Sequence, residues 1–140
     1  MIVHGTVVRP GEDHTSARLV EAAGPWFATS FHAVWEFRPE ALDAVPGGAV
    51  WRDAMLAARP ERDRHLAVHE GHVVVVTDRD RAAVAAAGPA ILASGWTGTA
   101  DAVRARLEAA AAAGVSEIVY TPAGPDIAGE LDAFRVAAAG

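Results

Sequence analysis

The segment GWTGTADAVRARLEAAAAAGVSEIVYTPAGPD, residues 95–126, limits the possible folds more than any other part of the chain. Thr99 is a good helix N-cap, the apolar residues after it recur at helical spacing, and Gly114 is placed where a left-handed residue ends a helix. The run SEIVYT then predicts a strand, and Asp126 predicts the cap of a last helix after a glycine-proline loop. A helix flanked by strands in this way normally connects parallel strands of an α/β sheet.

Two further runs have the composition of strands. The residues from Ile2 to Val8 are mostly β-branched and stop at Pro10 and Gly11, which predicts a buried parallel strand. The four valines Val73–Val76 also predict a strand, whereas the residues from His65 to His72 are ambiguous and could extend a helix instead.

Helical spacing accounts for most of the remaining chain. One helix is predicted to end at the Gly24-Pro25 pair, and the aromatic-rich segment PWFATSFHAVWEF is predicted as a second helix. A short amphipathic helix is expected over AVWRDAMLAAR, between a glycine turn and Pro60. Asp78 is expected to cap a helix that runs to Ala87.

These elements predict a single α/β domain over residues 1–140, with three or four short parallel strands in chain order and helices on one side. Hydrophobic residues make up 51% of the chain and charged residues 21%, as expected of a folded globular domain. No internal repeat and no linker rich in glycine or serine divides it.

Charge and composition exclude several functional classes. The net charge of −6 argues against a nucleic-acid surface, because phosphate binding needs a basic patch. The chain has no cysteine, and therefore no disulfide and no thiolate chemistry. It has no apolar run of about 18 residues and no signal-peptide pattern, so we expect a cytoplasmic protein with no membrane partner.

The closing segment TGTADAVRARLEAAAAAGVSEIVYTPAGPDIAGELDAF resembles the C-terminal end of luciferase-like (LLM class) oxidoreductases that depend on a flavin or on F420. The stretches GTVVRPGED, FHAVWE and RHLAVHEGH are similar to that family as well, so the resemblance covers nearly all 140 residues. It implies a (β/α)8 TIM barrel that binds FMN or coenzyme F420 and transfers hydride as a monooxygenase or reductase. Since a complete barrel takes about 250 residues, the resemblance implies a C-terminal half-barrel that lacks the first βα units.

The resemblance also implies where a site would lie, because barrel chemistry is carried by the loops at the carboxyl ends of the strands. Helix N-termini at Thr99 and Asp126 could receive an anionic group there, or these residues could simply cap their helices. The expected cofactor-binding residues are Arg9, Thr97, Gly98, Thr99, Thr121, Pro122, Ala123 and Gly124.

His32 and Glu36 are the expected catalytic residues. They are four positions apart and would meet on a helix whose other positions are aromatic. A carboxylate beside an imidazole raises the pKa of the imidazole and tunes proton transfer. The two side chains are expected to form a wall of the active site or, alternatively, a packed polar pair.

The histidines of RHLAVHEGH do not predict a metal site. His65, His69 and His72 would share one face of a helix, but in a strand the period of two separates His69 from His72. The segment HEGH also departs from the zinc-protease pattern H-E-x-x-H, because its second histidine follows the first by three positions.

The expected function is therefore hydride transfer between a flavin or F420 and a small organic substrate. The alternative is a non-catalytic half-barrel that acts as a binding or assembly module, and whether the isolated chain is an enzyme stays open. Because an open half-barrel leaves strand edges and apolar surface uncovered, the expected partner is a second copy of the chain or an N-terminal half-barrel.

Overall fold

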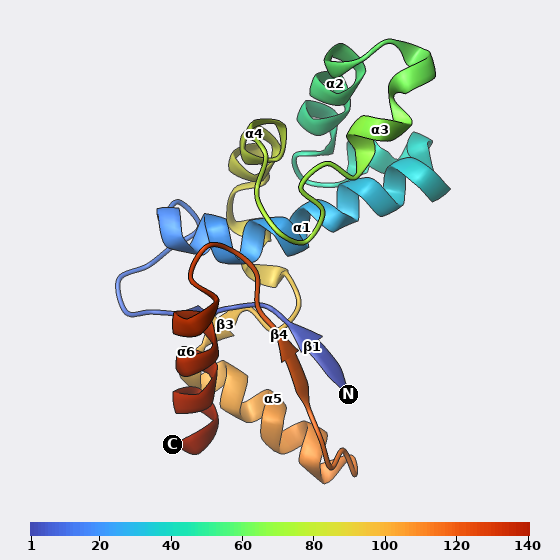
Figure 1. The fold of residues 1–140 in the computed structure, drawn as a ribbon. Coiled ribbons are helices and arrows are strands. Elements are labelled where there is room, and N and C mark those ends of the chain that lie inside the picture. The colour runs from blue at the N-terminus through green and yellow to red at the C-terminus, as the bar shows by residue number, and fades with distance from the viewer.

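The computed structural model describes residues Met1–Gly140. Figure 1 shows α1 crossing the middle of the molecule, with α2, α3 and α4 on one side and the strands, α5 and α6 on the other. We call residues 26–87 the helical lobe, and residues 1–16 and 94–140 the sheet lobe. The elements in chain order are β1 (Ile2–His4), β2 (Val7–Val8), α1 (Ala17–Phe37), η1 (Pro39–Ala44), α2 (Gly48–Ala58), η2 (Glu61–Asp63), α3 (His65–Val68), α4 (Asp78–Ala87), η3 (Gly88–Ala93), β3 (Gly98–Thr99), α5 (Ala100–Ala112), β4 (Val119–Thr121) and α6 (Ile127–Ala139).

The sheet lobe contains two short parallel ladders, which makes the protein α/β as predicted. β1 pairs with β4 in a register that places Ile2 opposite Val119, and β2 pairs with β3 in a register that places Val7 opposite Gly98. The first strand run is interrupted at Gly5, which has a φ of 135°. A Cβ there would lie 2.5 Å from the backbone nitrogen of Thr97, so glycine permits the close approach of the two backbones.

The predicted strand order is wrong. The first run lies between the other two strands, with β4 on one edge and β3 on the other, instead of at the end of a series in chain order. On the side of β4, the carbonyl of Met1 accepts a hydrogen bond from Val119. On the side of β3, the carbonyls of His4 and Thr6 accept hydrogen bonds from Trp96 and Gly98, respectively. The pairing partner of β4 is a non-local choice that the local pattern does not determine.

The predicted helix break at Gly24-Pro25 is also wrong, because α1 is continuous from Ala17 to Phe37 and contains Pro25. Proline removes one intrahelical hydrogen bond, to the carbonyl four residues earlier, which belongs to Glu21. The loop before α6 lies against that carbonyl, since a Cβ on Gly124 would come within 2.7 Å of its oxygen. The burial of Pro25 between this loop and the core explains how the helix tolerates it.

The valine run does not form a strand. Residues 69–74 form turns, Val75 to Thr77 have no regular structure, and Val73 has a φ of 63°. Val76 is buried against α1, where a Cβ on Gly24 would meet its Cγ2 at 2.7 Å. The position of Val76 is therefore set by its contact with α1, and not by pairing with a strand.

The helix ends of the second half of the chain agree with the predictions. Thr99 caps α5 by accepting a hydrogen bond from the N–H of Ala102 at 3.3 Å, and Asp126 caps α6 by accepting from Gly129 at 3.0 Å. Gly114, with a φ of 87°, follows the end of α5. Thr77 caps α4 as part of a capping box, one residue before the predicted cap.

Most of the buried apolar side chains belong to the helical lobe. Phe31, Leu42, Trp51 and Met55 are fully buried in one cluster built by α1, η1, α2 and α4. The sheet lobe has a smaller cluster, in which Val7 packs with residues of α5 and α6. None of the helices combines the length and the apolar character needed to cross a lipid bilayer.

Candidate functional site

A cleft of about 400 Å³ opens at the carboxyl ends of β2 and β3. Its walls are Val8–Glu12, which follows β2, and Thr99–Asp101, where β3 continues into α5. In α/β sheets, ligands bind outside the carboxyl ends of the strands. The structure therefore brings two of the predicted cofactor-binding residues, Arg9 and Thr99, to a place where that class of fold binds ligands.

Arg9 is the one basic side chain that lines this cleft. The guanidinium of Arg9 is exposed and makes no hydrogen bond within the chain. Both acidic residues of the walls already have arginine partners: Glu12 accepts a hydrogen bond from Arg18 at 2.7 Å, and Asp101 accepts from Arg104 at 3.2 Å. The hydrogen bond from Arg18 also lowers the pKa of Glu12. The N-terminus of α5, at the same cleft, adds the positive end of a helix dipole.

A buried polar network supports the cleft from below. Glu130 of α6 is 2% exposed and accepts hydrogen bonds from the hydroxyl of Thr6 and from the guanidinium of Arg18. Arg18 also donates to the carbonyl of Val7 at 2.9 Å and so joins α1 to β2. Because Arg18 bridges Glu130 and Glu12, the network fixes the loop that carries Arg9.

Thr97 and Gly98 have structural positions in the fold. The hydroxyl oxygen of Thr97, which is 2% exposed, accepts from the backbone N–H of Thr6 at 3.3 Å. Gly98 donates its own N–H to the carbonyl of Thr6 at 3.1 Å. Both residues therefore shape the strand end below the cleft, and neither lines it.

The second predicted loop lies at the other edge of the first strand run. Thr121 ends β4 and donates its hydroxyl to the carbonyl of Val3 at 2.9 Å. The next three residues, Pro122, Ala123 and Gly124, lead under α1, where Ala123 is buried. The structure thus separates this loop from Arg9 and Thr99 and does not place it in the cleft.

His32 and Glu36 are farther away still. They lie one turn apart on α1, in the helical lobe, while Arg18 of the same helix reaches the cleft wall. The 14 residues from Arg18 to His32 correspond to about 21 Å along a helix axis. His32 and Glu36 were expected to form a wall of the site at the strand ends, but the structure gives them a different set of neighbours.

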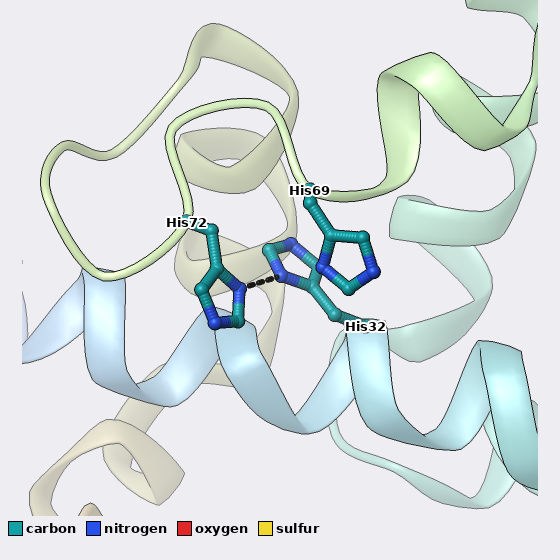
Figure 2. A group of neighbouring side chains, drawn as sticks. All are labelled: His32, His69 and His72. Carbon is teal, nitrogen blue, oxygen red and sulfur yellow. Dashed lines mark hydrogen bonds between the residues drawn. The ribbon is translucent and has the colours of Figure 1, made fainter.

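Those neighbours are two histidines from the turns after α3 (Figure 2). Nδ1 of His32 lies 2.8 Å from Nδ1 of His72, and one ring nitrogen of each of the three histidines lies within 4.8 Å of one from each of the others. Nε2 of His69 lies 2.7 Å from a carboxylate oxygen of Glu36. We call His32, His69 and His72 the histidine cluster.

His32 differs from the other two members in its surroundings. It is 1% exposed and packs beside Trp51, with the ring centroids 5.6 Å apart. Burial lowers its pKa to about 4, despite the opposing charge of Asp80, so the ring is neutral at pH 7. Its Nε2 is buried without a hydrogen-bond partner, which leaves Nδ1 as the nitrogen that faces the cluster.

Sequence reasoning missed this cluster because it depends on tertiary structure. His32 and His72 are 40 positions apart and meet only because the turns after α3 fold back onto α1. The spacing of His69 and His72 was visible, but no local pattern connected either of them to His32.

No family model, curated protein or solved structure matches this chain.

Proposed function

We propose that the protein is part of a luciferase-like oxidoreductase that transfers hydride between FMN or F420 and a small organic substrate. The observation that carries the proposal is the cleft at the carboxyl ends of β2 and β3. Both cofactors carry phosphate groups, and Arg9 together with the N-terminus of α5 suits a phosphate at this cleft. Thr99 both caps the N-terminus of α5 and lines the cleft.

In this proposal the cleft holds the anionic end of the cofactor, and His32 and Glu36, which do not line the cleft, are given no part in it. His32 is about 21 Å farther along α1 than Arg18, the residue of that helix that reaches the cleft wall. The remaining predicted residues, Thr121 to Gly124, support the site from the far edge of the sheet lobe.

We further propose that a second copy of this chain covers the exposed face of the β1–β4 ladder. The support is the apolar surface of the β1–β4 ladder, where Ile2 is 74% exposed and its partner Val119 is 48% exposed. In a (β/α)8 barrel consecutive strands are neighbours, whereas here the first strand run lies between β4 and β3, so the observed order does not show a half-barrel. An N-terminal half-barrel from another chain is the other occupant that would fit this edge.

Cofactor retention tests the proposal directly. The purified protein is dialysed against FMN and, separately, F420, and the retained chromophore is measured by visible absorption. We expect retention of one of them, and we expect it to fall at least about tenfold in Arg9→Ala, because a charge-assisted contact contributes about 1.5–3 kcal/mol. Arg135→Ala is the matched control, since Arg135 is exposed on α6 and pairs only with Asp132.

The result that would reject the proposal is equally direct. If neither chromophore is retained and neither NAD(P)H nor reduced F420 is oxidised, hydride transfer is ruled out for this chain. The non-catalytic binding or assembly module would then be the remaining function, and the exposed β1–β4 ladder would be its contact surface.

A further inference from the structure

We propose that the histidine cluster binds one late first-row divalent metal ion, with Zn²⁺ as the physiological candidate. His32, His69 and His72 would each supply one ring nitrogen, and water or a substrate atom would take the fourth position. This inference is independent of the proposed oxidoreductase function, because the cluster lies in the helical lobe and away from the cleft.

The positions of the ring nitrogens come close to those of a metal site. Two imidazole nitrogens bound to one tetrahedral Zn²⁺, each at about 2.0–2.1 Å, lie about 3.3 Å apart. In the structure Nδ1 of His32 and Nδ1 of His72 are 2.8 Å apart, so they need to separate by about 0.5 Å. His72 lies in an exposed turn next to Gly71, which has a φ of 75°, so this shift involves no packed side chain.

The third ligand is oriented by a carboxylate. Nε2 of His69 is paired with Glu36 at 2.7 Å, and in Figure 2 the other nitrogen of this ring, Nδ1, faces His32. Metal-bound histidines usually donate their second N–H to a carboxylate or carbonyl, which fixes the tautomer and makes the ligand more basic. Glu36 occupies that supporting position in the structure.

The donors and their exposure indicate which ions are suitable. A set of three nitrogens suits Zn²⁺, Co²⁺, Ni²⁺ or Cu²⁺, whereas Mg²⁺ and Ca²⁺ prefer oxygen ligands. His32 closes the site on the protein side, while His69 and His72 are exposed and leave a position open to water. Three protein ligands with one open position is the arrangement found in catalytic zinc sites.

The arrangement is poorly explained without an ion. The three imidazoles share one hydrogen bond among themselves, and Nε2 of His32 is buried with no partner. A buried polar group without a partner costs free energy, which an apolar residue at position 32 would avoid. Binding of an ion by Nδ1 of all three rings would leave Nε2 of His32 without a partner, but it would replace the single hydrogen bond of the cluster with three metal–ligand bonds.

Cobalt binding tests the proposal, because tetrahedral Co²⁺ with nitrogen ligands absorbs visible light. The protein is prepared without a polyhistidine tag, treated with a chelator and titrated with Co²⁺, and the bound metal is counted after equilibrium dialysis. We expect one Co²⁺ per chain, a visible absorption band, and displacement of Co²⁺ by Zn²⁺. Hydrogen exchange at residues 69–76 should slow when the metal is bound, since the turn would be tied to α1.

Substitutions of the two exposed ligands keep the test separate from folding. We expect His69→Gln and His72→Gln each to weaken binding at least about tenfold, because even the loss of an outer-shell partner weakens metal affinity about 10–100-fold. Glu36→Gln should weaken it within that range. His65→Gln is the matched control, since His65 is exposed in the same segment and lies outside the cluster.

The proposal is overturned by either of two results. One is the absence of stoichiometric Co²⁺ binding in the folded wild-type protein. The other is binding that survives unchanged in His69→Gln and His72→Gln, because the ion would then be held elsewhere.

Discussion

The two lobes of this molecule differ in how many large apolar side chains they bury. The helical lobe surrounds Phe31, Trp51 and Met55 completely, and its aromatic rings contact one another in a continuous cluster. The sheet lobe buries few large side chains and leaves Ile2 and Val119 exposed on paired strands.

Parallel strands in other α/β proteins are normally covered on both faces. The helical lobe therefore has a closed core, although Phe37, Leu66 and Val74 are exposed on its surface, whereas the sheet lobe has paired strands that a further element would cover. Measurements of unfolding, hydrogen exchange and sedimentation can each strengthen or remove this distinction between the lobes.

The largest difference should appear when one core side chain is truncated in each lobe. Phe31→Ala in the helical lobe should reduce the free energy of unfolding by about 3–5 kcal/mol, because it leaves a cavity in a closed core. Val103→Ala in the sheet lobe removes two methyl groups and should cost about 1.6 kcal/mol. Urea denaturation of both variants measures the difference, and equal losses would show that the two cores are equally complete.

Arg18 tests the junction between the lobes. Arg18→Ala leaves Glu130 buried without its ion-pair partner, and we expect a loss of about 3–5 kcal/mol in the free energy of unfolding. The double variant with Glu130→Gln should recover part of that loss, because it removes the unpaired charge. Thermal melting of the single and double variants provides the measurement, and additive losses would contradict the assigned coupling.

Acid should weaken the helical lobe before the sheet lobe. Burial lowers the pKa of His32 from its ordinary value of 6.5 to about 4 in the folded protein, so the folded state binds fewer protons than the unfolded state between these two values. Its contribution to stability is therefore complete above pH 6.5 and decreases as the pH falls toward 4, with a loss of about 2 kcal/mol at pH 5.

Amide hydrogen exchange would show which helices lose protection when the pH falls. A chelating buffer keeps metal ions away from His32 during the measurement. We expect faster exchange in α1 and α2 at pH 5 than at pH 7, after correction for the intrinsic rates. His32→Gln, which cannot take up the proton, is the control and should lose this part of the pH dependence. A loss of protection that begins in α5 and α6 would contradict the assignment to His32.

The smallest effect on stability is expected at the exposed ladder. Ile2→Thr and Val119→Thr should each change the free energy of unfolding by less than about 0.5 kcal/mol, since both side chains face solvent in the single chain. If a second copy covers the ladder, the same substitutions should shift the sedimentation coefficient toward that of the monomer. Wild-type protein that stays monomeric across concentration would remove the argument that the sheet lobe is incomplete.

Features that depend on short-range chemistry could be predicted from the sequence. Thr99, Gly114 and Asp126 set the ends of two helices through backbone contacts within four residues, and a fixed spacing reveals such contacts. The strand at Val119 and its parallel orientation were predicted on the same basis.

Features that depend on tertiary contacts between distant segments could not be predicted from local sequence patterns. The continuity of α1 through Pro25 depends on a loop from near the C-terminus, and β4 pairs with β1 although β3 is its neighbour along the chain. The candidate site shows the same division. Arg9 and Thr99 were predicted from the ends of strands, but the contact of His32 with His72 depends on turns where the sequence favoured a strand.

The β1–β4 ladder also has a consequence for synthesis of the chain on the ribosome. Val119, the partner of Ile2, is translated 117 positions after it and after the whole helical lobe. At about 5–20 residues per second, the 32 residues between Ala87 and Val119 take roughly 2–6 s, during which the helical lobe can already fold. The nascent β-branched run from Ile2 to Val8 has no strand beside it until β3 is translated, and β1 stays unpaired until β4 follows, so we expect this run to be the segment that chaperones bind.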